Sequence, residues 1–204
     1  MIGDEDMRKM SAIRRARAAS GAAAALALTT IVAGAQTHGT PERFTAMAVN
    51  FDSPAGGAAG TVEFVVNRWS TDAERDKLMT ALLEKGPEKL LDVLQSNPRV
   101  GYIRTPNSVG YDLRYARRVP GEDGGERISL VTDRPITFWE ASNRPRSIDY
   151  PFTVIELRIG PDGKGEGKLS IATKITADSD NKTIVLENYA IQPVLLQSVR
   201  REKK

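Results

Sequence analysis

Alternating apolar and polar positions dominate the chain and predict a protein built mainly from β-strands. The longest alternating stretch, Ser147–Thr176, has two apolar arms, 152–157 and 169–175, around a run of four glycines from Gly160 to Gly167. This pattern predicts a long β-hairpin with a glycine-rich turn. Shorter alternating segments predict further strands at 44–49, 61–68, 99–105, 109–118, 128–130, 136–140, 183–189 and 193–200.

The same alternation predicts which side chains share a face of each strand. In 109–118 it places Tyr111, Leu113 and Tyr115 on one face, opposite Ala116. In 193–200 it places Val199 on the face opposite the two residues Val194 and Leu196.

One part of the chain has helical spacing. Thr71 and Glu74 have the spacing of a capping box, and four apolar residues between 78 and 83 follow on one face. Gly86 then ends this helix, and Pro87 begins a second one, which stops at Asn97. We expect this two-helix unit to be a structural cover over one face or end of a sheet, rather than a lid that gates a ligand.

The order of these segments predicts an α+β fold. Short connections between consecutive strands favour antiparallel neighbours, because a parallel return needs a long crossover. We therefore expect an antiparallel β-meander of about nine strands, strongly curved or barrel-like, with the two helices inserted between the second and third strands. A single domain, 36–204, accommodates all of it, with flexible ends at 36–42 and 201–204.

Residues 1–35 are typical of an export signal. Five basic residues precede an uncharged run, Ala18–Ala35, and small residues stand before Gln36, where a signal peptidase would cut. A short membrane anchor is the alternative interpretation. The leader holds five of the 29 Lys and Arg and three of the 26 Asp and Glu. Its removal leaves a nearly neutral chain, exported to the periplasm or secreted, without a stable membrane span and with no reason to bind nucleic acid.

The rarest residue types exclude several chemistries. The chain has no cysteine and one histidine, His38, so disulfides, thiol catalysis, a Ser-His-Asp triad and a histidine-based zinc site are not expected. The glycine run precedes a strand rather than a helix, which disfavours a phosphate loop. Asp162 and Glu166 could belong to a calcium site, but Lys164 stands between them where an oxygen ligand would be needed. The stretch that begins at Asp178 lacks the required ligands in the same way, so a calcium site is disfavoured at both places. We expect no cofactor and no metal.

Aromatic and charged residues are densest between residues 139 and 150, where prolines stiffen the chain. Trp, Tyr and Arg are the residue types that dominate binding sites. The competing interpretation is that Trp139 and Tyr150 plug one end of the sheet while the arginines pair with Glu140 and Asp149. Together with tyrosines of the strand 109–118, the candidate binding residues are Tyr111, Tyr115, Trp139, Arg144, Arg146 and Tyr150.

A hydrolase that uses two carboxylates needs no histidine and stays open. The acids nearest to apolar neighbours are Glu140, Asp149 and Glu156. Glu156 shares a strand face with Phe152 and Val154, where burial would raise its pKa. A position at the edge of the sheet or facing solvent explains a glutamate in this strand equally well, so we assign no catalytic residue.

Four stretches together resemble a group of exported bacterial proteins of unknown function: Arg43–Ala46, Arg68–Arg75, Gly101–Thr105 and Arg146–Phe152. The resemblance covers most of the chain after the leader and implies a bacterial envelope location, but no activity, cofactor or catalytic residue. We expect a non-enzymatic periplasmic or secreted module that binds a small apolar ligand or an envelope partner. A carboxylate-dependent, glycosidase-like hydrolase and a purely structural envelope protein are the alternatives.

Overall fold

The computed structural model describes residues 40–51, 58–134, 136, 152–171, 174–178, 183–187 and 193–202. All of them belong to one compact unit, Gly34–Lys204. The expected leader, 1–35, lies outside the described residues. In the part of the chain that is described, no helix has the length and hydropathy to cross a bilayer.

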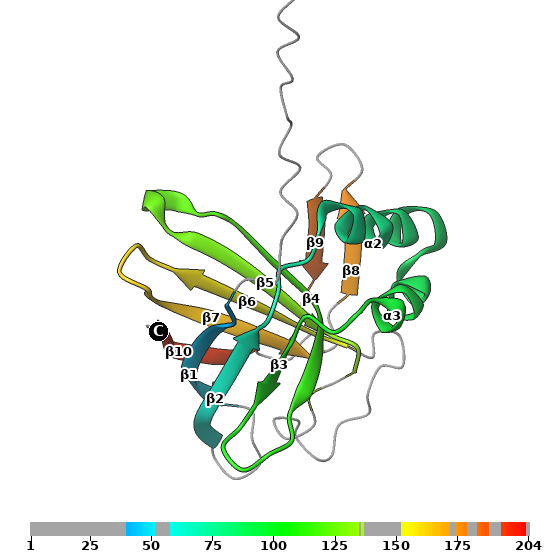
Figure 1. The fold of residues 1–204 in the computed structure, drawn as a ribbon. Helices are drawn as coiled ribbons and strands as arrows, with labels where there is room; N and C mark the ends of the chain where they lie inside the picture. The colour runs from blue at the N-terminus through cyan, green and yellow to red at the C-terminus, as the bar shows by residue number, and fades with distance from the viewer. Residues whose placement is uncertain are drawn as a thin grey trace, which may run out of the picture. The chain divides into compact units, whose positions relative to one another are not determined.

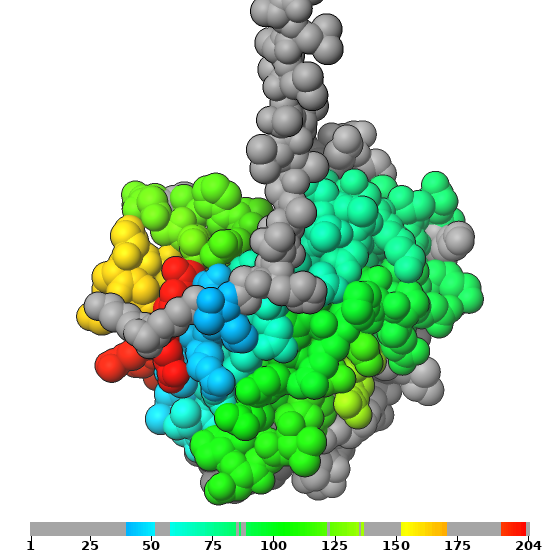
Figure 2. Space-filling model, viewed as in Figure 1, coloured from blue at the N-terminus to red at the C-terminus, as the bar shows by residue number. Residues whose placement is uncertain are grey.

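Eight antiparallel strands form a closed barrel (Figure 1). They follow one another around the barrel in chain order, and the last strand closes the circle against the first. Figure 2 shows this closure on the surface, where red β10 lies beside blue β1. The strands are β1 (Glu42–Asn50), β2 (Ala58–Val66), β3 (Gly101–Arg104), β4 (Tyr111–Pro120), β5 (Glu126–Thr132), β6 (Thr153–Ile159), β7 (Lys164–Ile171) and β10 (Val194–Arg201).

The predicted antiparallel meander is confirmed, and the barrel is closed because β1 pairs with both β2 and β10. The barrel has eight strands rather than about nine. Two further strands, β8 (Lys174–Asp178) and β9 (Thr183–Glu187), form a separate two-stranded sheet in the connection between β7 and β10. Glu42 and Arg201, which fall within the ends expected to be flexible, are strand residues.

Apolar side chains from alternate strand positions fill the barrel interior, as the period-two pattern predicts. The largest of them, Phe44 and Phe64, are completely buried. This core cluster reaches Trp69, just after β2, and Ile136, just after β5. These two residues mark the two ends of the barrel, because β2 and β5 finish at opposite ends of an antiparallel barrel.

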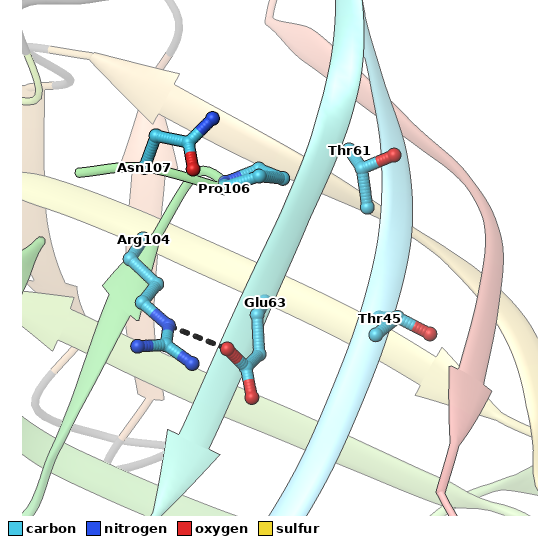
Figure 3. A pocket seen from close by; sticks show the side chains of 6 residues that line it. All are labelled: Thr45, Thr61, Glu63, Arg104, Pro106 and Asn107. Carbon is cyan, nitrogen blue, oxygen red and sulfur yellow. Dashed lines mark hydrogen bonds and ion pairs between the residues drawn. The ribbon is translucent and has the colours of Figure 1, made fainter.

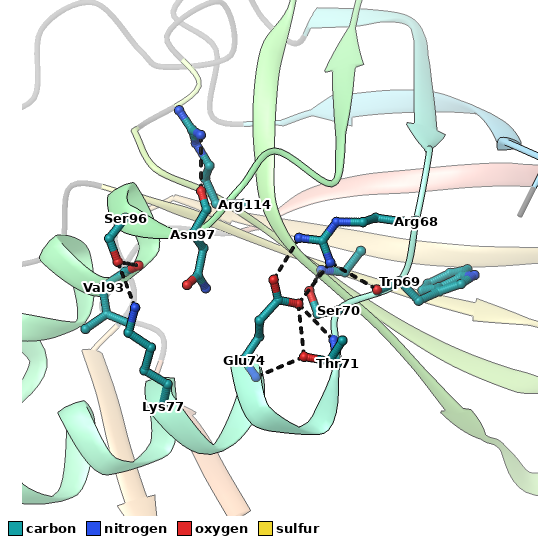
Figure 4. A network of polar contacts seen from close by, with 11 residues as sticks. Arg68, Trp69, Ser70, Thr71, Glu74, Lys77, Val93, Ser96, Asn97 and Arg114 are labelled. Atoms are coloured by element: carbon teal, nitrogen blue, oxygen red, sulfur yellow. Dashed lines mark hydrogen bonds and ion pairs between the residues drawn. The ribbon is translucent and has the colours of Figure 1, made fainter. Parts of the chain in front are cut away.

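The helices α2 (Asp72–Lys85) and α3 (Pro87–Ser96) lie between β2 and β3 in the chain, where they were expected. The capping box is present: the Glu74 amide donates to Thr71 Oγ1 at 3.2 Å, and the Thr71 amide donates to Glu74 Oε2 at 2.8 Å (Figure 4). The pair covers the outer face of β4–β6. The buried cluster beneath it contains Leu78, Leu82, Leu90, Leu94, Phe152 and Val154.

Two strands contain an extra residue that reverses the predicted faces. Between Leu113 and Tyr115 the register of β4 against β5 shifts, so Ala116 enters the barrel core and Tyr115 lies beneath the helices. In β10 the shift falls between Leu196 and Val199, and it turns Val199 into the core. A bulge of this kind moves every later side chain to the other face of its strand.

The glycine-rich hairpin is confirmed, but its turn is shorter than expected. Only the four residues Gly160–Gly163 connect β6 and β7, and a short 3₁₀ helix, η1 (Glu122–Gly124), makes the corresponding turn between β4 and β5. Gly165 and Gly167 are strand residues. A Cβ atom at Gly165 would stand 1.7 Å from the carbonyl oxygen of Arg158, so the close approach of the two strands requires glycine there.

The second arm of that hairpin also ends earlier than predicted. β7 finishes at Ile171, and Lys174 begins β8, which pairs with β9 in the separate sheet. The alternation from 169 to 175 therefore spans two strands of different sheets. A period-two pattern records which residues face the same way, but it does not record which sheet a strand joins.

Candidate functional site

The structure describes two of the six candidate binding residues, and it separates them. Tyr111 begins β4 and packs against the barrel core, whereas Tyr115 lies in the cluster between the barrel wall and the helices. Burial there raises the pKa of the Tyr115 hydroxyl. The other four candidates lie outside the described residues: Trp139, Arg144, Arg146 and Tyr150.

Tyr111 lies at the barrel end where β5 finishes and β6 begins. The guanidinium of Arg134 stands over its ring, 5.7 Å from the centroid. Beside it, Thr132 Oγ1 donates to the Arg134 carbonyl at 2.6 Å and accepts from the Thr153 amide at 2.9 Å. The Ile136 amide donates in turn to Thr153 Oγ1 at 3.1 Å. These bonds fix the places where the chain leaves the described barrel and returns to it.

A guanidinium on the outer wall supports the same region. Arg114 Nε donates to Asp133 Oδ2 at 2.8 Å, and its Nη1 donates to the carbonyl of Asn97 at 3.3 Å. Figure 4 shows this second bond at the end of α3. Asp133 and Arg134 are consecutive, so the connection after β5 starts from residues whose side chains are already held by ion pairing and stacking.

The opposite end of the barrel is closed by a network around Glu42. The Trp69 ring nitrogen Nε1 donates to Glu42 Oε1 at 3.0 Å, and Arg118 Nη1 donates to the same oxygen at 3.1 Å. Arg201 Nε lies 3.5 Å from Glu42 Oε2, an ion pair rather than a hydrogen bond. Arg201 also pairs with Glu126. We call these five residues, Glu42, Trp69, Arg118, Glu126 and Arg201, the sealed-end network.

The sealed-end network spans the barrel end instead of running along its wall. Arg118 on β4 reaches Glu42 on β1, and β3 and β2 lie between these strands. Arg201 on β10 reaches Glu126 on β5 across β7 and β6. Three strand spacings amount to roughly 14 Å along the wall, far beyond the reach of an ion pair, so both contacts pass over the end of the barrel. Arg118 and Arg201 also cover the rings of Trp69 and Phe44.

Two of the acidic residues considered for catalysis or calcium binding, Glu156 and Asp162, have structural partners. Glu156 does share a face with Phe152 and Val154, but it is part of an exposed ion pair, 3.3 Å from Arg158 Nε and 3.7 Å from Arg127 Nε. Of the interpretations that the sequence left open for Glu156, the structure favours the solvent-facing position over burial. Asp162 Oδ1 accepts from the Lys164 amide at 3.0 Å within the β6–β7 turn.

Glu140 and Asp149, the other two acids proposed for hydrolysis, lie outside the described residues, as does His38. Over the described ranges, no group of three or more His, Cys, Asp or Glu residues is arranged to hold a metal ion. Of the other acids considered for calcium, Glu166 is an exposed residue of β7 and Asp178 is the last residue of β8.

One polar site was not anticipated from the sequence. A depression of about 380 Å³ lies on the outer wall of β1–β3 (Figure 3). At its base, Glu63 accepts from Arg43 Nη1 at 2.6 Å and from Arg104 Nε at 2.5 Å. Burial by itself would raise the pKa of Glu63, but the bonds from Arg104 and Arg43 outweigh it and hold the pKa below its usual range. The depression is lined by Thr45, Thr61, Glu63, Arg104, Pro106 and Asn107.

The sequence gives little sign of this depression because its residues come from three strands and a turn. The pairing register aligns Thr45 with Glu63 and Glu63 with Arg104, although Arg104 is 41 residues from Glu63. A charged residue in the middle of the apolar strand β2 is the only local signal. Comparisons of the chain with protein families, with curated proteins and with solved structures found no match.

Proposed function

We propose that this chain is an exported, non-enzymatic module that binds a small apolar molecule or an envelope partner at the barrel end that carries Tyr111. The difference between the two barrel ends carries the proposal. The sealed-end network crosses one end, so a ligand that approached there would have to break ion pairs and displace Trp69. At the other end no ion pair between the described residues crosses from one side of the barrel to the other, and Tyr111 lies there beside the Arg134 guanidinium.

The connections at the two ends support the same choice. At the sealed end the connections β4–β5 and β6–β7 are short turns, and the long connection between β2 and β3 folds into α2 and α3, which cover the outer face of β4–β6. At the Tyr111 end the chain leaves at Ile136 and returns at Phe152, and between them the sequence places Trp139, Tyr150 and the two arginines. Loops carried by a rigid scaffold are where binding residues concentrate. Aromatic rings would supply apolar contact, and Arg144 or Arg146 would pair with an anionic group.

Nothing in the described structure favours the hydrolase. Of the three acids proposed for it, the described one, Glu156, is an exposed ion-pair member on the outer wall. The purely structural alternative draws support from the dense apolar filling of the barrel. The experiment described next distinguishes a structural protein from a binding module, since a structural protein would carry and bind no small molecule.

The test combines native mass spectrometry with a fluorescent probe. The protein is purified from its own cell envelope without denaturation, and we expect a reproducible extra mass that is lost on unfolding. We also expect the amphipathic probe 1-anilinonaphthalene-8-sulfonate to bind the folded protein at one site, because it has apolar rings and one anionic group.

Substitutions then locate the bound probe. Trp139→Ala should weaken probe binding about tenfold, as expected for the loss of one aromatic contact in a binding site. Tyr102→Phe is the matched control, because Tyr102 is an aromatic residue on the outer wall at β3. A protein with no extra mass and no probe binding, or one whose probe binding survives Trp139→Ala, would refute the proposed site.

A further inference from the structure

We propose that the depression on the outer wall of β1–β3 is a second binding site, and that it recognises a sugar bearing an acidic group. The site is distinct from the barrel end proposed above, because it lies on the outside of the wall and is built from other strands. Its volume, about 380 Å³, falls within the roughly 300–1,000 Å³ of small-molecule sites.

The base of the depression is a rigid row of three side chains. Thr45, Glu63 and Arg104 occupy paired positions on neighbouring strands β1, β2 and β3. Each strand is held in the closed barrel by pairing on both sides, so these side chains start from fixed backbone positions. Figure 3 shows Glu63 between the other two, with Thr61 farther along β2. A ligand therefore meets a preorganised surface.

The rim of the depression is a well-defined turn. Ser108 closes the turn after β3, donating from its amide and its hydroxyl to the Thr105 carbonyl at 3.2 and 3.1 Å. Ser108 Oγ also accepts from the Thr105 amide at 3.1 Å. Pro106 fixes its own φ angle, and Asn107 adopts a φ of 70°. The turn thus holds the amide of Asn107 and the apolar ring of Pro106 at the edge of the site.

The hydrogen-bonding groups in the site are only partly used. Each carboxylate oxygen of Glu63 accepts one bond from an arginine and retains capacity for a second. Arg104 uses Nε for Glu63, and its guanidinium stands over the Tyr102 ring, 5.4 Å from the centroid, whereas its Nη1 and Nη2 make no hydrogen bond to the described residues. Donors and acceptors therefore stand next to each other beside two threonine hydroxyls. Sugar hydroxyl groups, which both donate and accept, match this mixture better than a simple anion does.

The charge of the site selects an acidic sugar over a neutral one. Two guanidinium groups, Arg43 and Arg104, surround a single carboxylate, which leaves an excess of one positive charge. Glu63 remains ionised at neutral pH because the arginines lower its pKa, so this balance does not change near pH 7. The Nη edge of Arg104 can hold a carboxylate in a bidentate arrangement.

The test is NMR titration of the ¹⁵N-labelled full chain with three probes: D-glucuronate, D-glucose and inorganic phosphate. We expect glucuronate to shift the amide signals of Glu63, Arg104 and Asn107 and to bind at least tenfold more tightly than the other two. Glucose binding as tightly as glucuronate would overturn recognition of the acidic group. Phosphate binding as tightly would reduce the site to a simple anion site. Signals that do not move with glucuronate would remove the site altogether.

Three substitutions locate the site without depending on stability. Asn107→Gly should weaken glucuronate binding about threefold, and it leaves the turn intact because glycine adopts a φ of 70° without strain. Arg104→Lys should weaken it about tenfold or more, since an ammonium group cannot form the bidentate contact. Arg99→Lys is the matched control. Arg99 also stands over the Tyr102 ring, 5.3 Å from its centroid, but does not line the depression. Equal weakening by Arg99→Lys and Arg104→Lys would contradict the assignment.

Discussion

Removal of the Glu42 carboxylate tests the sealed end of the barrel most directly, because this group contacts three partners, two through hydrogen bonds and one through an ion pair. Glu42→Ala leaves Trp69 Nε1 without its acceptor, and Trp69 is only 8% exposed. An unsatisfied buried donor costs about 1–3 kcal/mol. The substitution also breaks the ion pairs with Arg118 and Arg201, which are partly exposed and contribute about 0.5–1 kcal/mol each.

The expected loss for Glu42→Ala is therefore about 3 kcal/mol in the free energy of unfolding. For a domain of this size that corresponds to a fall in Tm of roughly 6–12 °C. Glu42→Gln should lose only about 1–2 kcal/mol, since the amide oxygen can still accept from Trp69 while the charge attraction is gone. Glu166→Ala, which removes an exposed carboxylate from β7, is the control and should change stability by less than about 0.5 kcal/mol.

Urea unfolding followed by far-UV and near-UV circular dichroism measures all three variants, provided that the two signals change together. The predicted order of stability loss is Ala, then Gln, then the control. If Glu42→Ala unfolds at the same urea concentration as the unmodified protein, the network does not stabilise the barrel end. If Ala and Gln lose the same amount, the bond from Trp69 contributes nothing and the argument from burial is wrong.

Three further results follow from particular contacts. The hydrogen bond from Arg68 holds the pKa of Glu74 in the folded protein below its usual value of 4.5. The ionised Glu74 carboxylate therefore stabilises the fold above pH 4.5, and this stabilisation is lost as the pH falls through the lower pKa of the folded protein. Urea unfolding at pH 7 and at about pH 3.5 should show a smaller difference for Glu74→Gln than for the unmodified protein. Gly165→Ala should cost about 3 kcal/mol or prevent folding, measured by thermal unfolding, because its Cβ would meet the Arg158 carbonyl. Thr71→Ala should cost about 1 kcal/mol in urea unfolding through loss of the α2 cap.

Local signals predicted the helices and the strand order well. Thr71, Gly86 and Pro87 act within one turn of the residues they affect, so the helix boundaries are encoded where they occur. Strand alternation likewise depends on neighbouring residues. The bulges were missed because no residue type near Tyr115 or Ser198 indicates an extra residue. Ser198 adopts a φ of 52°, but serine is not a residue type that predicts a positive φ.

Nonlocal contacts account for what the sequence did not predict about the sites. The need for glycine at 165 comes from a carbonyl on the neighbouring strand, and the depression exists only because pairing aligns Glu63 with residues of β1 and β3. Candidate residues selected by type, such as Tyr111 and Tyr115, can be separated by a single inserted residue between them. The type of a residue shows what its side chain can do chemically, whereas the register of the strands determines which side chains lie next to each other.

The topology also explains why the sealed end and the proposed ligand end differ. The described chain enters the barrel at Glu42 and leaves it at Arg201, and both residues belong to the sealed-end network. The first and last strands must pair with each other to close the barrel. Charged residues at the outer ends of these two strands therefore hold the strands together and also cover the end of the barrel. The Arg118 and Arg201 contacts across the end further connect β4 and β5 to this junction. The Tyr111 end does not have to join the chain's two ends, and its connections can therefore vary in length and composition without loss of barrel closure. That freedom is the physical reason to place ligand recognition there.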